Sequence, residues 1–355
     1  MNIEEIPTEG YERVVHCKDP DSGLNAFISV HNTTLGPALG GVRMLPYGSE
    51  EEVLADAMRL AKAMTYKAAV AQTGQGGGKG VIIADPSEKT EALLLAMGRF
   101  IESLDGQYIA AEDMNMTVED LETMARETRW VSGMSRERAS SGNPSPLTAL
   151  GCFVGMQVSA AEVFGSESLS GRRIVVQGVG AVGSALAEMC LEDGAEVMVC
   201  DLDGDKARRF AELSGATALE GPDACLSHPC DILSPCARGG ILNANTVSKL
   251  GCRIVAGAAN NQLNEPADAD RLRKRGILYA PDYVINAGGV INIACEFAPE
   301  GYSEAVARER VMGIGPALAE VYRIAREEDI STAAAADRLA QARLAEGRIT
   351  NPSGG

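Results

Sequence analysis

The chain has 355 residues, of which 45% are hydrophobic and 23% charged, and it carries a formal net charge of -17 at pH 7. This length predicts two or three domains, and the acidic balance argues against nucleic acid or an anionic membrane surface as a partner. No uninterrupted apolar stretch is long enough to cross a membrane, and Met1–Glu5 lacks a basic and then apolar signal, so we expect a cytoplasmic protein.

The cysteines and histidines disfavour metal chemistry. Nine cysteines are scattered without a CxxC pair, and Cys190, Cys200 and Cys252 lie in or beside apolar runs, which favours buried free thiols over disulfides or zinc ligands. None of the three histidines sits near another ligand type at metal spacing, so we expect neither a metal nor histidine-based catalysis. Acid–base chemistry would then fall to Lys, Asp, Glu or Tyr side chains.

The first part of the chain alternates strand and helix signals, which predicts an α/β domain. The expected elements are strands at 11–17 and 24–31, a glycine-punctuated loop at 35–43, a helix that Ser49 caps and that runs to Thr65, a strand at 81–84, a helix at 92–104, a strand from Tyr108 that delivers Glu112 and Asp113, and a helix that Thr117 caps.

Two lysines, Lys67 and Lys79, flank an apolar run and a glycine-rich stretch. The glycines at 76–78 let the backbone approach a ligand closely, and we expect them to form a turn that places Lys79 at the start of a strand. A nucleotide-binding P-loop is excluded, because Thr73 stands where the first glycine is required and Gly80 replaces the Ser or Thr. Taken alone, the stretch is equally compatible with a tight turn between solvated lysines.

A Ser/Gly/Pro-rich segment at 140–148 predicts a hinge between two domains. We expect a substrate or catalytic domain at 1–140, with a C-terminal helix at 330–355 packing back on it, and a nucleotide-binding domain at 145–329.

The prediction of a nucleotide-binding domain depends on a GxGxxG spacing that has a strand before it and a helix after it, as such a site requires. A strand at 174–177 leads into Gly178, Gly180 and Gly183, a helix follows, and a second strand ends in Asp201 about twenty residues on. The glycines admit a pyrophosphate to the helix N-terminus, and the acid suits the adenosine ribose hydroxyls. This favours NAD over NADP, although the basic residues at 206, 208 and 209 weaken that inference.

Further strand and helix signals follow to the end of the chain. The expected elements are a helix at 148–163, strands at 231–233, 253–256 and 276–279, amide-bearing loops at 257–262 and 281–290, a long helix at 304–327 and an alanine-rich helix that Thr332 caps. The amides suit a nicotinamide carboxamide or a substrate carboxylate, and the alternative is that each Asn only forms a turn.

These features resemble the Glu/Leu/Phe/Val amino acid dehydrogenases. The matching motifs occur in the family's order and cover nearly the whole chain: Gly36–Arg43, Met64–Lys67, Gly76–Lys79, Ala111–Asp113, Ser141–Pro146, Gln177–Gly180, Ala258–Leu263 and Ala280–Gly289. The resemblance implies two α/β domains with a cleft between them, one of them a Rossmann domain. It also implies NAD-dependent, reversible oxidative deamination of an L-amino acid to its 2-oxo acid and ammonia.

The resemblance also implies roles for single residues. Lys67 would bind the substrate α-carboxylate, Lys79 would be the catalytic base and Asp113 the catalytic acid. The other expected substrate-binding residues are Leu39, Gly40, Ala111, Asn286, Val290 and Ile293. The expected cofactor-binding residues are Thr148, Gly178, Gly180, Ala181, Val182, Gly183, Asp201, Ala258 and Asn260.

The expected substrate is a branched-chain L-amino acid, leucine or valine. Leu39 and Val290 stand at pocket positions that tend to be smaller in aromatic-specific members, and no further lysine motif near Leu39 provides a cation for the second carboxylate of glutamate. Asn115, however, matches the aromatic-specific members, which leaves phenylalanine or tryptophan as the alternative. A non-catalytic NAD-binding sensor is an alternative from another class. The resemblance implies a homo-oligomer whose size the sequence leaves open.

Overall fold

The computed structural model describes residues 1–135 and 141–350. The chain divides into two compact units: unit 1 comprises Met1–Asn143, Ile293–Ser303 and Ala340–Gly355, and unit 2 comprises Pro144–Asn292 and Glu304–Leu339. Two boundaries differ from those expected from the sequence. Unit 1 also includes the short segment Ile293–Ser303, which no shift in composition predicts, and it takes up the C-terminal segment from Ala340 rather than from residue 330.

Unit 1 is built on a mixed six-stranded sheet with the order β1-β2-β3-β5-β4-β6. Its strands are β1 (Asn2–Glu5), β2 (Arg13–Asp19), β3 (Leu24–Asn32), β4 (Ala38–Leu45), β5 (Gly76–Ile83) and β6 (Tyr108–Glu112), and its helices are α1 (Glu50–Ala71), α2 (Glu91–Glu102) and α3 (Val118–Met124). The pairs β1 with β2, β2 with β3, and β3 with β5 are antiparallel, whereas β4 runs parallel to both β5 and β6.

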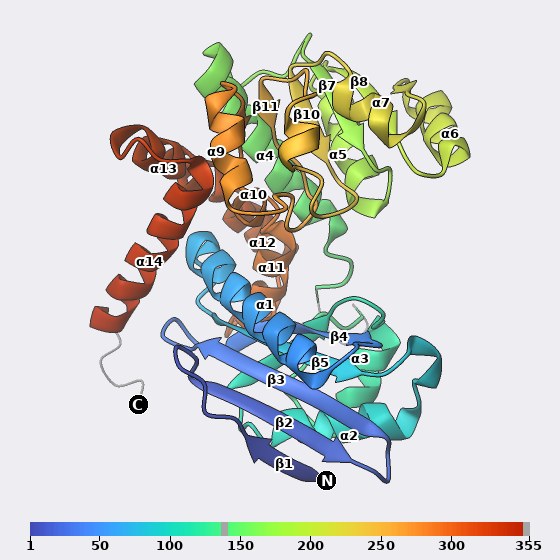
Figure 1. Cartoon of the computed structure of the whole chain (residues 1–355), viewed down its shortest axis with the longest axis vertical. Helices are drawn as coiled ribbons and strands as arrows, with labels where there is room; N and C mark the ends of the chain where they lie inside the picture. The colour runs from blue at the N-terminus through green and yellow to red at the C-terminus, as the bar shows by residue number, and fades with distance from the viewer. Residues whose placement is uncertain (136–140, 351–355) are drawn as a thin grey trace. The chain divides into compact units, whose positions relative to one another are not determined.

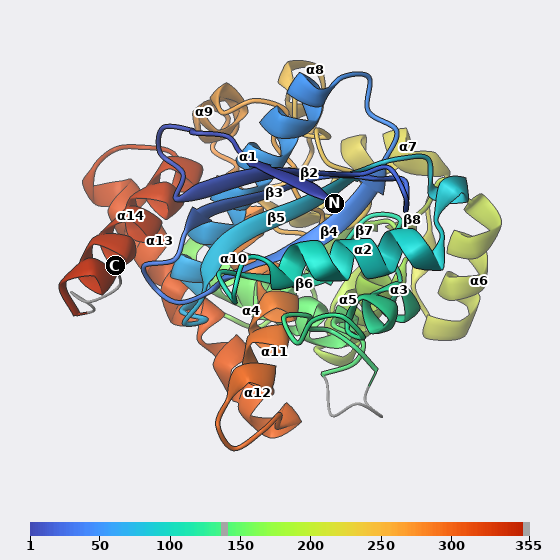
Figure 2. The ribbon, with the colours of Figure 1, turned by 90° about the horizontal axis from the view of Figure 1, so that it is seen from below.

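The two faces of this sheet are covered by different helices (Figures 1 and 2). Phe27 and Val81 pack against Val53 and Ala57 of α1, whereas alternate residues such as Ile28 belong to the larger core on the α2 side. Side chains alternate between the faces along each strand. The register therefore decides which residues face α1. The predicted caps Ser49 and Thr117 are confirmed, since each side chain accepts a backbone N–H of its helix.

The glycine stretch at 76–80 forms part of β5, and the prediction of a turn there is wrong. A Cβ at Gly77 would lie 2.1 Å from the Thr65 backbone nitrogen of α1, and one at Gly78 would lie 2.7 Å from the Tyr108 ring. The missing side chains thus allow α1 and Tyr108 to press against the two faces of the strand. The glycines serve close packing of the strand and its neighbours.

Unit 2 is built on a parallel six-stranded sheet with the order β12-β11-β10-β7-β8-β9. Numbered from β7, this is the 3-2-1-4-5-6 order of a dinucleotide-binding doubly wound fold. The strands are β7 (Arg173–Gln177), β8 (Glu196–Cys200), β9 (Thr217–Ala218), β10 (Ile232–Pro235), β11 (Ile254–Val255) and β12 (Leu278–Tyr279).

The helices that lie wholly within unit 2 are α4 (Ser145–Phe164), α5 (Ala181–Glu192), α6 (Gly204–Ser214), α7 (Gly221–Ser227), α8 (Ala244–Val247), α9 (Ala267–Lys274), α10 (Asp282–Ile285), α12 (Glu304–Met312) and α13 (Ile314–Glu327). Two further helices, α11 (Gly288–Ala294) and α14 (Thr332–Thr350), have residues in both units.

These helices differ from the sequence prediction in three places. The expected loop at 281–290 is largely helical, and the expected helix at 304–327 is interrupted at Gly313. At the start of α14, Ser331 rather than the predicted Thr332 accepts the N–H of Ala334.

The predicted hinge segment begins at Ser140, which lies outside the described residues, and its last residues already form the start of α4. Among the described residues, α4 is the one helix long and apolar enough to cross a membrane by length and composition, and half of its apolar window is buried inside the fold. It packs on α5, α12 and α13 of the same unit, which is the position of a core helix.

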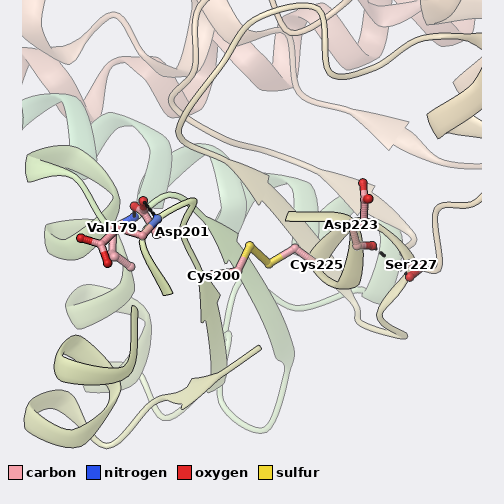
Figure 3. Close-up of a disulfide and its surroundings, with 7 residues drawn as sticks. Val179, Cys200, Asp201, Asp223, Cys225 and Ser227 are labelled. Carbon is pink, nitrogen blue, oxygen red and sulfur yellow. Dashed lines mark hydrogen bonds between the residues drawn. A yellow bond between two sulfur atoms is a disulfide. The ribbon is translucent and has the colours of Figure 1, made fainter. Parts of the chain in front are cut away.

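Cys200 and Cys225 form a disulfide, so the interpretation of Cys200 as a free thiol is wrong (Figure 3). Cys200 ends β8 and Cys225 lies in α7, with their Cα atoms 6.4 Å apart and both side chains buried. That separation is within bridging range, but the two cysteines lie 25 positions apart in sequence, and only the fold brings them together. Cys190 and Cys252 are buried free thiols, as expected.

Candidate active site

In unit 1, several predicted site residues share the sheet face that α1 covers. Val42 and Met44 of β4 belong to the core on the α2 side, so the alternate residues Leu39, Gly41 and Arg43 face α1. By the same alternation Lys79 of β5 and Ala111 of β6 lie on this face, and Leu39, Ala111 and Lys79 are all buried. The parallel alignment of β4 with both β5 and β6 brings them to one part of the sheet.

Lys79 and Asp113 meet on this face. Asp113 directly follows β6, and its Oδ2 accepts hydrogen bonds from Lys79 Nζ and, at 3.0 Å, from Arg43 Nε. The Lys79 side chain is 7% exposed and that of Asp113 is 25% exposed, so the carboxylate keeps an open side. The predicted base and acid are therefore in direct contact within one unit.

Gly41 provides the space for this contact. It lies on β4 opposite Ala111 of β6, and a Cβ at Gly41 would come within 2.6 Å of the Asp113 Cβ. Any side chain at position 41 would occupy the volume through which Asp113 reaches over β4 toward Lys79. The glycine of the motif Gly36–Arg43 thus has a steric role.

Burial and charge set the protonation states of the pair. Burial lowers the pKa of Lys79 below the ordinary lysine value, and Arg43 lowers it further, against the opposing effect of Asp113. For Asp113, burial raises the pKa, but the charges of Lys79 and Arg43 and their hydrogen bonds outweigh it and hold the pKa below its usual range. This arrangement favours an ionised carboxylate beside an amine that gives up its proton more readily than an exposed lysine.

Arg43, Asp56 and Tyr47 were not predicted as site residues. Arg43 Nη1 donates to Asp56 Oδ2 of α1 at 3.0 Å, and Tyr47 Oη donates to the same oxygen at 2.7 Å. The sequence signal for Arg43 is its place at the end of the motif Gly36–Arg43. Its contact with Asp113 depends on the register of β4 beside β6, which the sequence does not give.

Lys67 and Gly40, two further predicted substrate-binding residues, also belong to unit 1. Lys67 lies near the C-terminal end of α1 and is half-buried. Gly40 points to the other face of the sheet, where a Cβ would collide with the Gly78 carbonyl, and its own carbonyl accepts a hydrogen bond from Tyr108 Oη at 2.6 Å. A contact of Gly40 with substrate would thus involve its backbone alone.

In unit 2, the glycine turn lies at the point where the strand order reverses, between β7 and β10. Gly178 has a φ of +98°, which favours glycine, and a Cβ there would lie 2.9 Å from the Ala237 Cβ that follows β10. A Cβ at Gly183 would lie 2.0 Å from the Gly178 carbonyl, so this glycine allows α5 to pack on the turn. Ligands of doubly wound sheets bind at such a reversal.

The N-terminus of α5 fits a dinucleotide pyrophosphate. No side chain caps the helix at Gly180, and a Cβ at Gly180 would meet nothing within 4 Å. Ala181 and Val182 form the first turn, and the N–H groups there are those that a helix start offers to an anion. The open space at Gly180 and the absence of a protein cap are what a bound phosphate requires.

Asp201 is held beside this turn at the end of β8. Its Oδ2 accepts from the Val179 N–H at 2.9 Å (Figure 3). Its Oδ1 accepts from the Asp203 N–H at 3.1 Å. Burial alone would raise the pKa of Asp201, but these backbone hydrogen bonds and Lys206, whose Nζ lies 3.9 Å away, lower it. An anchored carboxylate therefore stands where the ribose of a dinucleotide is expected.

The predicted amide residues of unit 2 contact one another. Asn286 is buried, and its Nδ2 donates to Asn260 Oδ1 at 2.8 Å and to the Ala258 carbonyl at 3.1 Å. Thr148 lies in the first turn of α4, and its Oγ1 would be 2.8 Å from a Cβ at Gly289. Val290 of α11 belongs to unit 2, whereas Ile293 of the same helix belongs to unit 1.

Comparison with known proteins identifies the family. The model of the Glu/Leu/Phe/Val dehydrogenase dimerisation domain matches residues 11–133, and that of glutamate/leucine/phenylalanine/valine dehydrogenase matches residues 201–350. The chain belongs to this family. It is accordingly an oxidoreductase that acts on the CH–NH2 group of an amino acid, and the family is NAD(P)-dependent. The expectation of a two-domain amino acid dehydrogenase is confirmed.

Individual relatives differ in the substrate that they are named for. The chain is 49% identical to a leucine dehydrogenase from Geobacillus stearothermophilus, over 96% of this chain and 92% of the relative. It is 45% identical to a valine dehydrogenase from Streptomyces virginiae, over 96% and 95%. The crystal structure of L-tryptophan dehydrogenase from Nostoc punctiforme is similar with a TM-score of 0.86 and 43% identity, over 96% of this chain and 97% of that one. Similarity alone therefore leaves the substrate open.

Proposed function

We propose that this dehydrogenase converts a branched-chain L-amino acid, leucine or valine, reversibly to its 2-oxo acid and ammonia with NAD as the hydride acceptor. The observation that carries the proposal is the contact of Lys79 with Asp113 on the same sheet face as the buried, apolar Leu39. It provides a base, an acid and an apolar surface together.

The chemistry follows from the two protonation states. A neutral Lys79 amine accepts a proton and activates the water that attacks the substrate iminium, and Asp113 exchanges protons with the amino group and the tetrahedral intermediate. The half-buried Lys67 binds the α-carboxylate as a point charge. Bound NAD would accept the hydride from the substrate carbon. The first turn of α5 and Asp201 would bind the cofactor, and Thr148, Ala258 and Asn260 would lie toward its nicotinamide.

NAD is proposed over NADP because of Asp201. The carboxylate is fixed by two backbone N–H groups and its pKa is lowered, so it stays charged at neutral pH. A 2′-phosphate would meet this charge, whereas ribose hydroxyls can donate to it. Lys206 Nζ, 3.9 Å from Asp201 Oδ2, partly offsets the repulsion between Asp201 and a 2′-phosphate.

The branched-chain preference depends on apolar bulk at the proposed substrate positions. In unit 1, the buried Leu39 would limit the space for the substrate side chain on the α1 face of β4. Val290 and Ile293 are proposed substrate-binding residues on the resemblance alone. An apolar residue at position 39 offers no charge to the second carboxylate of glutamate. Since one methylene discriminates by only about 1–3 kcal/mol, broad activity on aliphatic amino acids is expected.

An aromatic substrate is the second candidate, favoured by the similarity to the solved L-tryptophan dehydrogenase. The aromatic-type Asn115 supports it less than the sequence alone suggests. Asn115 has a φ of +62°, a conformation that asparagine tolerates, and its Nδ2 donates to the Met44 carbonyl at 3.0 Å. These contacts give Asn115 a local structural reason to be present.

Two further proposals concern assembly and location. We propose a homo-oligomer, supported by the description of the matched N-terminal model as a dimerisation domain. A cytoplasmic location is proposed, supported by the packing of the apolar helix α4 within unit 2.

The direct test is a substrate panel. Initial rates of NADH or NADPH formation at alkaline pH are measured with L-leucine, L-valine, L-isoleucine, L-phenylalanine, L-tryptophan and L-glutamate. We expect the highest kcat/KM for the branched-chain acids with NAD. A preference for the aromatic acids would overturn the substrate proposal while keeping the reaction, and a preference for NADP would overturn the role of Asp201.

A paired variant tests the pocket itself. Leu39→Ala removes bulk on the α1 face of β4, so the ratio of kcat/KM for L-phenylalanine over L-leucine should rise by at least about tenfold. Val42→Ala is the matched control, because Val42 lies on the same strand and belongs to the core on the opposite face. An unchanged ratio in Leu39→Ala would show that Leu39 does not line the substrate side chain.

A further inference from the structure

Arg43 connects the catalytic carboxylate to helix α1. Its Nε donates to Asp113 Oδ2 and its Nη1 to Asp56 Oδ2, both at 3.0 Å, and its side chain is 15% exposed. The guanidinium thus binds one carboxylate on each side. Its backbone belongs to strand β4, and its guanidinium is bonded to Asp113 after β6 and to Asp56 of helix α1.

The far carboxylate is itself fixed. Asp56 accepts from Tyr47 Oη at 2.7 Å on Oδ2 and from Arg59 Nη2 at 2.7 Å on Oδ1. Burial raises the pKa of Asp56, but these hydrogen bonds and the two arginine charges outweigh it. A chain of charged contacts therefore runs from the Arg59 side of α1 through Arg43 to the oxygen that Lys79 also binds.

The charges around Lys79 come from several elements. Besides Asp113 and Arg43, the titratable or charged groups on the elements that pack against β5 include Asp56, Arg59, Lys62, Tyr66 and Lys67 of α1, His31 of β3, Tyr108 and Glu112 of β6, and Tyr47 after β4. Burial has the largest effect on the pKa of Lys79, followed by the charges of Asp113 and Arg43, with Asp56 contributing less. Arg43 is the cation that lowers the pKa of Lys79 most.

We propose that Arg43 is a positioning residue of the dehydrogenase reaction: it fixes the Asp113 carboxylate against Lys79, and its permanent charge favours the neutral, proton-accepting form of the Lys79 amine. The inference rests on the proposed function, because it assigns Arg43 to the same acid–base pair. Arginine suits this task since its planar fork bonds two carboxylates at once and keeps its charge at every working pH. A lysine at position 43 would keep the charge but not both hydrogen bonds.

The test is the pH profile of kcat/KM for L-leucine deamination in Arg43→Gln, Arg43→Lys and Arg59→Gln. The ascending limb reports deprotonation of the base. Loss of the neighbouring cation raises the pKa of Lys79, so in Arg43→Gln the limb should move up by about one pH unit. In Arg43→Lys the limb should stay near its wild-type position while kcat falls. Arg59→Gln, which removes an exposed cation from the same network, should leave the limb in place.

A second readout does not require turnover. The rate at which acetic anhydride acetylates Lys79, measured by peptide mass spectrometry across pH, gives the titration midpoint of this amine directly. The titration midpoint should rise in Arg43→Gln and should stay at the wild-type value in Arg43→Lys and Arg59→Gln. If Arg43→Gln does not fold, Arg43→Met takes its place, because it keeps an apolar stem of similar length without the charge.

The outcomes separate this inference from the proposed function. A wild-type enzyme that deaminates leucine, combined with an unmoved limb and midpoint in the neutral variants, overturns the role of Arg43 alone. A wild-type enzyme that is inactive on every amino acid of the panel overturns the proposed function, and the acetylation midpoints still decide whether Arg43 controls Lys79. A shifted midpoint with a matching shift of the limb supports both.

Discussion

A single carboxylate oxygen, Asp113 Oδ2, receives hydrogen bonds from both Lys79 and Arg43. Its position depends on a neighbour that has no side chain, because a Cβ at Gly41 would come within 2.6 Å of the Asp113 Cβ. The position of the proposed acid–base pair therefore depends as much on the missing side chain at Gly41 as on the charged groups. This gives Gly41 a testable role that no charge or hydrogen bond would indicate.

Gly41→Ala should displace Asp113 from Lys79 and lower kcat for amino acid oxidation by about 100-fold, since a misplacement of about 1 Å costs that much in catalysis. The measurement is steady-state kcat with L-leucine, with a thermal melt to establish that the variant is folded. Gly48→Ala is the matched control, because a Cβ there would approach only the flexible end of Glu52, at 3.3 Å. A folded Gly41→Ala enzyme with wild-type kcat would contradict the steric role.

Among the elements, strand β8 carries two features that affect unit 2. It ends in Cys200, which is bridged to Cys225 of α7, and the next residue, Asp201, accepts the Val179 N–H of the glycine turn. The bridge joins two cysteines that lie 25 positions apart in sequence, and both of their side chains are buried. It therefore restricts the unfolded chain around the strand that positions the proposed cofactor acid.

Cys225→Ala should destabilise unit 2 by about 3 kcal/mol, the loop-closure entropy expected for a bridge of this span. The measurement is thermal unfolding followed by circular dichroism, where this loss corresponds to a drop in Tm of about 6–12 °C for a unit of this size. Reductant is the internal control, since it should lower the Tm of the wild-type protein and leave that of the variant unchanged. Equal melting of the wild-type protein and the variant would contradict a stabilising bridge.

For the whole chain, the sequence predicted the two α/β domains, the GxGxxG turn and the family, because these depend on local periodicity and on spacing within one strand and helix. It failed where the answer depends on strand neighbours. The glycines at 76–78 were interpreted as a turn because their role, close packing against Thr65 and Tyr108, involves residues distant in sequence. Arg43 was missed for the same reason, since its contact with Asp113 spans 70 positions.

The most direct test of the proposed catalytic role of Lys79 is NADH formation from L-leucine by Lys79→Ala, measured together with NADH binding by fluorescence titration. We expect kcat/KM to fall by about 10²–10⁴-fold, the usual contribution of a positioned base, while NADH binding is retained, because the glycine turn and Asp201 belong to unit 2. Lys62→Ala, which removes an exposed lysine from α1, should behave like the wild-type enzyme. Undiminished turnover in Lys79→Ala would contradict the assignment of the acid–base pair.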